Sequence, residues 1–369
     1  MLFYMEKIIE TRNRIMGFLY KNVLKQIAFQ FDPEKVHNFF LATGKIFGSN
    51  MVTKEITKDL FNYENSILRQ KILGIDFRNP VGLSAGFDKN AELLNILGDV
   101  GFGFAEVGSV TKLQCDGNPG VRLERLPEKK SIWVNFGLNN KGADEISSRL
   151  YKKKFDIPFA VSIAKTNCAA TANDKVGIQD YVYSLKKFNE LNVGNLFVLN
   201  ISCPNAYGGQ PFSRAEAYRD LLKEVSKLKV RKPIFVKLSP DLTKKEIDSI
   251  LEISGKNKIA GFIISNLTKK HDKGKGGLSG KMVEDRSNAL LSYVYSKTRG
   301  KYVLIGVGGV FSAEDAYKKI KLGASLVSLI TGMIFNGPNL MSEINQGLVE
   351  LLKKDGYKNI SEAIGADLK

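Results

Sequence analysis

The chain has 369 residues, of which 43% are hydrophobic and 25% are charged. These values are ordinary for a folded protein, and the length allows either two domains or one α/β barrel of about 250 residues with additions. The three cysteines are too few and too scattered for a disulfide framework or a CxxC metal site, and they suit a reducing cytoplasm. No run reaches the roughly 18 apolar residues that span a bilayer.

The formal net charge is +17 at pH 7. Lysines and arginines are spread along the whole chain, and no zinc-finger, RNP or helix-turn-helix signature accompanies them, so we expect no nucleic-acid partner. The excess of positive charge instead favours anionic partners, either an anionic substrate or a surface of anionic lipid head groups.

Residues 1–46 predict helices. Apolar residues from Ile8 to Ile27 recur there at steps of three and four. A second helix is predicted to begin at Asp32-Pro33, because Asp is a favourable N-cap and Pro suits the first helical position. These helices carry both apolar and basic residues, so two interpretations stay open: they pack on the main domain, or they face a membrane.

Eight short apolar runs then alternate with amphipathic helical stretches. Their near-continuous apolarity predicts parallel strands buried on both faces, and eight such units predict an α/β fold, a closed (β/α)8 TIM barrel over residues 47–369. The segment KILGIDFRNP from Lys71 predicts a hairpin that plugs the bottom of this barrel. The eight runs are VGLSAG from Val81, FAEVGS from Phe104, FAVSIA from Phe159, LFVLNIS from Leu196, IFVKLS from Ile234, GFIISN from Gly261, VLIGVGG from Val303 and LVSLITG from Leu326.

Polar residues come directly at the ends of several strands, where a barrel of this kind builds its active site. They are Asp88, Lys89, Asn200, Cys203, Lys237 and Asn266. A single Asn or Lys in such a place is better explained as a helix cap or a structural side chain, but their shared placement predicts one site. Glycines at 306, 308 and 309 follow the seventh strand, and Thr331-Gly332 follows the eighth, which suggests a phosphate-bearing cofactor.

Seven ordered motifs resemble those of the dihydroorotate dehydrogenase family. They are NPVGLSAGFDKN from Asn79, GFGFAEVGSVT from Gly101, GNPGVRLERLPE from Gly117, NISCPN from Asn200, KLSPDL from Lys237, GGLSG from Gly276, and IGVGGV from Ile305 with GASLV ending at Val327. The resemblance implies a TIM barrel that oxidises dihydroorotate to orotate in pyrimidine biosynthesis with flavin mononucleotide (FMN) at the barrel mouth.

The resemblance also implies residue roles. The phosphate of FMN would lie on the Gly306–Gly309 and Thr331–Gly332 loops, and a positive charge at Lys237 would stabilise the reduced ring. The implied cofactor contacts are Ala85, Gly86, Gly108, Ser109, Asn200, Lys237, Ser265, Gly280, Gly308, Gly309, Thr331 and Gly332. The implied substrate contacts are Lys89, Asn139, Asn200, Asn205 and Asn266.

Cys203 is the candidate base that removes a proton from C5 of dihydroorotate. A free thiol has a pKa of about 8.5, and we expect two nearby lysines to favour the thiolate, which is the form that accepts a proton. Outside the NISCPN motif, we would interpret a cysteine at a strand end as a small buried hydrophobic residue. We interpret Cys115 and Cys168 in this way.

The electron acceptor divides the family into a quinone-using, membrane-associated branch and a soluble branch. The segment FQFDPEKVHNFF and the ERLPE insertion resemble the quinone branch, in which His37 and Arg125 would line a quinone tunnel. Cys203 and Leu138 instead match the soluble branch, whose acceptor is fumarate-like. The chain also departs from the family pattern at Val134, Ser162 and Leu267, and at Ile330, where the quinone branch tends to have Tyr.

The favoured hypothesis is therefore a quinone-dependent dihydroorotate dehydrogenase bound peripherally to the cytoplasmic face of the membrane. One alternative is a flavoenzyme that uses a soluble acceptor or another pyrimidine. A second is a barrel that has lost its flavin through the departures at Val134, Ser162 and Leu267 and acts only as a basic membrane-binding protein.

Overall fold

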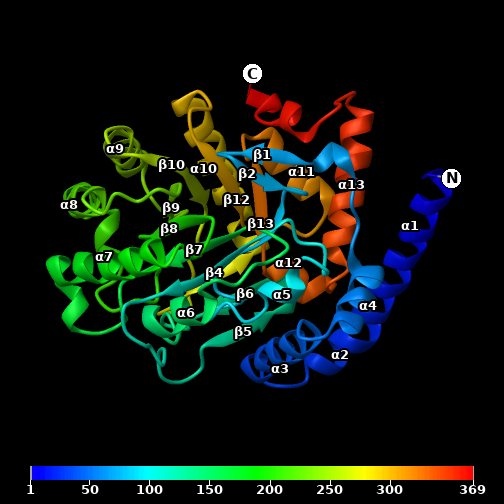
Figure 1. Ribbon diagram of the computed structural model, residues 1–369, viewed down its shortest axis with the longest axis horizontal. Helices are drawn as coiled ribbons and strands as arrows, with labels where there is room; N and C mark the ends of the chain where they lie inside the picture. Colours follow the sequence, from blue (N-terminus) through cyan, green and yellow to red (C-terminus); the bar gives the residue numbers. More distant parts are fainter. Residues whose placement is uncertain (1, 369) are drawn as a thin grey trace.

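The computed structural model describes residues 2–368, with side chains from residue 6 onward, and is shown in Figure 1. Eight parallel strands form a closed barrel in which sequential strands are neighbours and the last pairs with the first. All eight predicted runs are strands, so the predicted TIM barrel is confirmed. The strands are β3 (Val81–Leu83), β4 (Phe104–Val110), β7 (Phe159–Ile163), β8 (Leu196–Asn200), β9 (Ile234–Leu238), β10 (Ile259–Ile264), β12 (Val303–Val307) and β13 (Leu326–Leu329).

Large apolar side chains fill the barrel interior, and the predicted plug closes its bottom. The hairpin of β1 (Gln70–Ile72) and β2 (Ile75–Phe77) places Phe77 edge-to-face on Phe104, with ring centroids 5.7 Å apart. A Cβ added at Gly82 would lie 2.3 Å from the Phe104 ring, so that strand position must be glycine for the ring to fit. The interior cluster is Phe77, Phe104, Ala160, Leu196, Val198, Phe235, Ile263, Ile305 and Leu326.

Helices surround the barrel, and three of them, α7 (Asp174–Glu190), α9 (Lys244–Gly255) and α11 (Ala313–Lys321), begin with side-chain caps. Thr243 and Glu246 form a capping box at the start of α9, and Asn173 accepts two backbone N–H bonds at the start of α7. The helices that follow the strands are α5 (Leu94–Leu97), α6 (Ala143–Leu150), α7 (Asp174–Glu190), α8 (Ala215–Ser226), α9 (Lys244–Gly255), α10 (Glu284–Thr298), α11 (Ala313–Lys321), α12 (Thr331–Asn336) and α13 (Leu340–Lys354).

A small antiparallel sheet lies beside the mouth, at the opposite end of the barrel from the hairpin (Figure 1). It consists of β5 (Leu123–Leu126), β6 (Ser131–Val134) and β11 (Gly277–Gly280), with Val134 opposite both Leu123 and Gly277. The sheet joins the insertion after β4 to the segment after β10. We did not predict it from the sequence, because its strands are short and β5 is only partly buried.

The N-terminal helices agree with the prediction and extend beyond residue 46. Helix α3 (Pro33–Phe47) begins where expected, and the Asp32 carboxylate accepts the N–H groups of Glu34 and Lys35 at 3.1 and 2.9 Å. A further helix, α4 (Met51–Phe61), follows. Helix α1 (Leu2–Leu19) continues through a π-helical turn, η1 (Tyr20–Leu24), into α2 (Lys25–Ala28).

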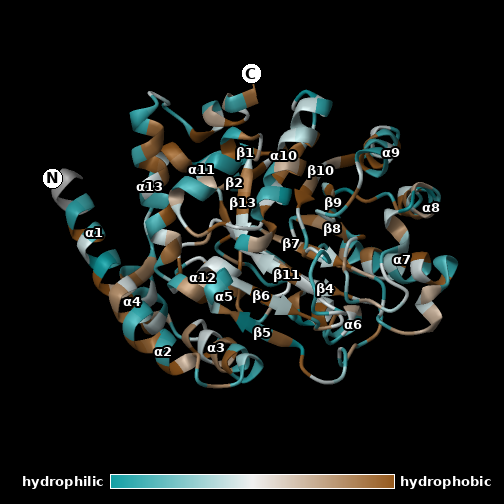
Figure 2. Ribbon diagram, turned by 180° about the vertical axis from the view of Figure 1, so that it is seen from behind, coloured by the Kyte–Doolittle hydropathy of each residue, from teal (hydrophilic) through white to brown (hydrophobic). Residues whose placement is uncertain are grey.

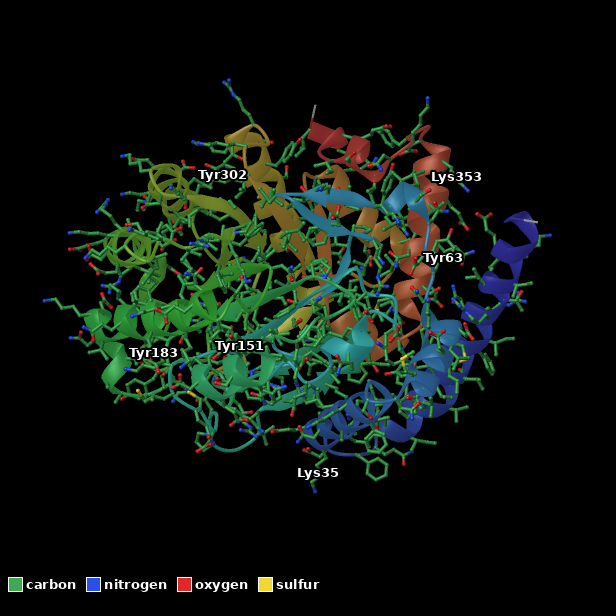
Figure 3. All side chains as sticks on the ribbon, viewed as in Figure 1. Lys35, Tyr63, Tyr151, Tyr183, Tyr302 and Lys353 are labelled. Carbon is green, nitrogen blue, oxygen red and sulfur yellow. The ribbon has the colours of Figure 1, made fainter. Side chains whose placement is uncertain are left out.

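Polar contacts fix α1 on the barrel domain. Arg12 donates to the Ser342 hydroxyl at 2.7 Å, and the buried Asn13 donates to Gln346 at 3.2 Å, both on α13. Lys353, labelled on α13 in Figure 3, forms an exposed ion pair of 3.5 Å with Glu6. Within residues 2–368, no helix combines the length and the apolarity needed to cross a bilayer.

The plug should contribute strongly to stability. Phe77 is 3% exposed, so Phe77→Ala should lower the free energy of unfolding by about 3–5 kcal/mol, through lost burial and the cavity left against Phe104. The neighbouring Asp76 side chain is exposed, and Asp76→Ala should change stability by about 0.5 kcal/mol or less. Urea unfolding followed by tryptophan fluorescence measures both variants. Equal stabilities would show that the hairpin is not part of the folded core.

Candidate active site

Three adjoining hollows lie at the carboxyl ends of the barrel strands. The central cavity and the glycine cavity share Ala85, Lys237 and Asn266, and the central cavity and the apolar tunnel share His37 and Phe87. Of the residues that the sequence analysis placed at the site, all but Asp88 and Gly306 line one of the three. The Asp88 carboxylate instead accepts the N–H groups of Glu92 and Leu93, each at 2.8 Å, and Gly306 lies within β12 against Lys319 and Ala324. The central cavity has Ala85, Gly86, Lys89, Gly108, Ser109, Asn139, Asn200, Cys203, Asn205, Lys237 and Asn266; the glycine cavity adds Ser265, Gly280, Gly308, Gly309, Thr331 and Gly332; the apolar tunnel has His37 and Arg125.

The glycine cavity is shaped by positions that only glycine can occupy. Gly280, Gly308 and Gly309 have φ angles of +93°, +102° and +80°, which lie in the region that disfavours other residues. A Cβ at Gly309 would lie 2.4 Å from the Cβ of Glu284. The backbone therefore comes to the cavity surface without side chains, which lets an anionic group approach its N–H groups closely.

Lys237, which lines the central cavity, forms a buried ion pair with Glu106. Lys237 Nζ lies 2.9 Å from Glu106 Oε2, and their side chains are 4% and 1% exposed. The same oxygen accepts the backbone N–H of Ala85 at 3.0 Å, and Ser84 Oγ lies 3.3 Å from Lys237 Nζ. The sequence analysis named Lys237 but missed Glu106, although a Glu in the middle of the apolar run FAEVGS was a visible signal.

Hydroxyl and amide groups form a chain along the same cavity. Asn266 donates to Asn200 Oδ1 at 3.2 Å, and Asn200 donates to Ser109 Oγ at 2.7 Å. Ser109 Oγ lies 2.9 Å from Ser162 Oγ. Ser162, one of the departures from the family pattern, therefore belongs to this hydrogen-bond network through its contact with Ser109.

Cys203 lies on the loop after β8 and lines the central cavity. Burial raises its pKa above the ordinary value; hydrogen bonds from the backbone of Asn205 and Ala206 and the charges of Lys165 and Lys237 oppose this effect without cancelling it. Two lysines do act toward the thiolate, as expected, but the larger effect of desolvation leaves the pKa of Cys203 above its ordinary value. Lys165 is 3% exposed, and the sequence analysis did not identify it as a charge close to Cys203.

Lys89 and His37 meet where the central cavity joins the tunnel. Lys89 Nζ lies 3.3 Å from His37 Nε2 and 3.9 Å from the centroid of the Phe136 ring. Burial lowers the pKa of Lys89 to about 8, and burial together with the charge of Lys89 lowers the pKa of His37 to about 3. His37 is thus neutral at physiological pH, and its ring packs edge-to-face on Phe87 at 4.8 Å.

Two further amides border the central cavity. Asn139 donates to the backbone oxygens of Cys115 and Asp116 at 3.2 and 2.8 Å. Asn205 donates to the backbone oxygen of Val134 at 3.1 Å, while its buried Oδ1 has no hydrogen-bond partner among the described residues. This oxygen is available to a ligand. Val134 thus holds Asn205 in place through its backbone oxygen.

The apolar tunnel lies between the N-terminal helices and the barrel. Arg125 donates to the backbone oxygen of Phe31 at 2.9 Å, and its guanidinium lies 4.6 Å from the centre of the Phe29 ring. Tyr20, on the π-helical turn, donates to the backbone oxygen of Ile334 at 2.8 Å, and burial raises its pKa to about 12. Ile330 lines the other two cavities instead of the tunnel. Most remaining tunnel walls are apolar, among them Val36, Phe40, Leu93, Ile96, Leu97, Val100, Phe102, Leu123, Ile132 and Met333.

Comparisons with known proteins agree with this arrangement. The model of the family described as dihydroorotate dehydrogenase matches residues 67–352. The dihydroorotate dehydrogenase (quinone) of Sulfurovum sp. strain NBC37-1 is 37% identical over 361 residues, which cover 96% of this chain and 100% of that protein. The enzyme of the same name from Christiangramia forsetii is 38% identical over 343 residues, 90% of this chain and 99% of that one.

A solved structure gives the same result. The structure of ligand-free dihydroorotate dehydrogenase (DHODH) from Eimeria tenella superimposes on this chain with a TM-score of 0.80 at 28% sequence identity. The superposition covers 92% of this chain and 100% of that one. The family model covers residues 67–352, and the similarity in sequence and in fold extends over at least 90% of the chain. The chain therefore belongs to the dihydroorotate dehydrogenase family.

Proposed function

We propose that the protein oxidises (S)-dihydroorotate to orotate in pyrimidine biosynthesis, with FMN as cofactor and a membrane quinone as electron acceptor. The observation that carries the proposal is the continuity of the three hollows: a glycine-lined cavity, a polar cavity with a thiol, and an apolar tunnel share lining residues in that order. A phosphorylated flavin, a polar pyrimidine and an apolar quinone would each have a matching environment.

The residues present fit FMN. The bare backbone at Gly308 and Gly309 suits a phosphate, and Asn205, which lines the central cavity, has a buried Oδ1 without a partner among the described residues. When bound, the flavin supplies an acceptor for the hydride from C6 of the substrate. A purified protein that lacks yellow flavin absorbance and cannot take up added FMN would instead support the hypothesis of a flavin-free barrel.

In this proposal the chain's own residues bind the pyrimidine and move one proton. Lys89 would pair with the negative charge of the substrate, and the amides of Asn139, Asn200, Asn205 and Asn266 would match the donors and acceptors of its ring. The Cys203 thiolate would accept the proton from C5 and become the neutral thiol. The apolar side chains of Phe136 and Leu138 line the same cavity.

The quinone-using branch is favoured over the soluble branch by the tunnel and by the relatives named as quinone enzymes. Cys203 and Leu138 remain as features of the soluble branch. We give the tunnel more weight, because it requires several helices to be placed together, whereas a base differs by one side chain. Turnover with a short-chain quinone, compared with turnover with fumarate, distinguishes the two acceptors.

The N-terminal helices also suit a membrane surface. Of the 23 large hydrophobic side chains exposed in the described residues, 16 lie between Ile8 and Leu60, a concentration that marks an interaction surface. Figure 2 shows apolar segments along α1 to α4 at one edge of the molecule, and Lys35 points outward from α3 in Figure 3. Anionic lipids would attract basic residues of these helices, among them Lys7, Arg14, Lys21 and Lys25, whereas Arg12 is turned toward α13.

Replacement of the base should affect the first half-reaction. Cys203→Ala should retain FMN but slow flavin reduction by dihydroorotate by about 10²–10⁴-fold, the usual contribution of a positioned general base. Cys168→Ala, in the neighbouring loop, is the matched control and should leave the rate unchanged. Anaerobic stopped-flow absorbance measures both, and a normal rate in Cys203→Ala would reject this assignment.

The pH dependence follows from the raised pKa of Cys203. Below that pKa the active thiolate fraction rises about tenfold per pH unit, so flavin reduction should accelerate from neutral pH upward and level off only above the ordinary thiol pKa of about 8.5. A rate that is already constant at neutral pH would mean that the bound substrate, or another group, lowers the thiol pKa.

Blocking the tunnel should separate the two half-reactions. Val36 lines the tunnel, so Val36→Trp should reduce turnover with a short-chain quinone by roughly tenfold or more, since a misplaced group obstructs approach of the acceptor. Flavin reduction by dihydroorotate should stay normal. Val52→Trp, on the exposed face of α4, is the control. Unchanged quinone turnover in Val36→Trp would favour a soluble acceptor.

Membrane binding should depend on the exposed apolar face. Phe18, Phe39 and Met51 are 63%, 65% and 77% exposed, so replacing all three with Glu should abolish co-sedimentation with anionic liposomes. Raising salt from about 0.1 M to about 1 M should weaken binding of the wild-type protein, because screening removes the electrostatic part. The control variant carries Val121→Glu and Met282→Glu, two substitutions at exposed positions outside the N-terminal helices. Equal sedimentation of both variants would mean that the N-terminal helices only pack on the barrel.

A further inference from the structure

Glu106 is a carboxylate in the middle of an otherwise apolar strand. It lies on β4, whose residues are all buried, and it is 1% exposed. Its Oε2 atom contacts three neighbours, namely Lys237 Nζ at 2.9 Å, Ala85 N at 3.0 Å and Ser84 Oγ at 3.4 Å. Its Oε1 atom has no hydrogen-bond partner among the described residues.

The partners of Glu106 connect it to the cavities. Lys237 and Ala85 line both the central and the glycine cavity, and Ser84 lines the glycine cavity. Glu106 itself lines neither, so it lies one layer beneath the surface that would meet the cofactor. It can act on the cofactor only through Lys237 and through its own charge.

The charge of Glu106 opposes that of Lys237. An unpaired ammonium at this place would strongly stabilise the negative charge that the flavin ring gains on reduction. The carboxylate at 2.9 Å offsets much of that field, because both groups lie in a medium of low dielectric constant where their interactions are strong. The expected positive charge at Lys237 is therefore half of a nearly neutral pair.

We infer that Glu106 is a positioning residue that holds Lys237 beneath the cofactor and lowers the midpoint potential of bound FMN by offsetting the lysine charge. The inference rests on the proposed function, because it requires FMN to bind above Lys237. A lower potential makes the reduced cofactor a stronger electron donor, which serves transfer to the acceptor. A carboxylate that only tied β4 to β9 would have no such effect.

The test is the midpoint potential of the FMN-loaded protein, measured by equilibration with a redox dye at mildly acidic pH, where an ammonium without its carboxylate is still protonated. Glu106→Gln keeps the shape and removes the charge. We expect it to favour the two-electron reduced form by at least tenfold, which corresponds to a rise of about 30 mV. Glu106→Asp keeps the charge at a greater distance and should give a smaller rise.

Glu252→Gln is the matched control, because it removes the same charge from an exposed position on α9 that lines none of the three cavities. Its potential should equal that of the wild-type protein. An unchanged or lower potential in Glu106→Gln would overturn the inference, and if that variant fails to fold, an unchanged or lower potential in Glu106→Asp would do so. A wild-type protein that binds no FMN would refute the proposed function instead, so the two failures are distinguishable.

Discussion

Closure of eight parallel strands into one barrel is the constraint on which the site depends. All eight carboxyl ends then meet at one mouth, so residues as distant in sequence as Ala85 and Gly309 line adjoining cavities. The interior below the mouth is apolar and closed by Phe77, so the buried Lys237 and Glu106 pair with each other and with the adjacent Ser84 and Ala85. Their pairing follows from the burial that the barrel imposes.

The N-terminal helices contact residues of the central cavity as well as those of the tunnel. Glu34 of α3 forms a close ion pair with Arg122 at the start of the small sheet, and His37 contacts Lys89. Arg125 holds the turn before α3 through the Phe31 carbonyl. Removal of these helices would therefore expose Lys89 and free Arg122, so point substitutions within the tunnel test the acceptor more cleanly than truncation does.

Much of the fold and of the site could be predicted from the sequence, because the strands are continuous apolar runs and the site residues stand at their ends. Glu106 and Lys165 could not be assigned, because a single charged residue within or just after a strand gives no sign of its partner. The small sheet escaped prediction because Leu123–Leu126 is only four residues long and places two adjacent charged residues between two leucines, which breaks the alternation typical of a half-buried strand. Tyr20 reaches the tunnel through a π-helical turn, whose extra residue no helical periodicity predicts.

Burial acts on the titratable groups of the central cavity in one direction, toward the uncharged form. It raises the pKa of Cys203, and it lowers those of Lys89 and His37 to about 8 and about 3. An anionic substrate would reverse this for Lys89, because the negative charge favours the ammonium and raises its pKa again. By linkage, binding of such an anion near pH 8 takes up part of a proton, and its affinity falls as the pH rises through the pKa of Lys89 in the free protein. In the proposed reaction Cys203 acts as a thiolate, whose fraction increases over the same range, so the site would balance substrate binding, which weakens with pH, against base strength, which grows with it.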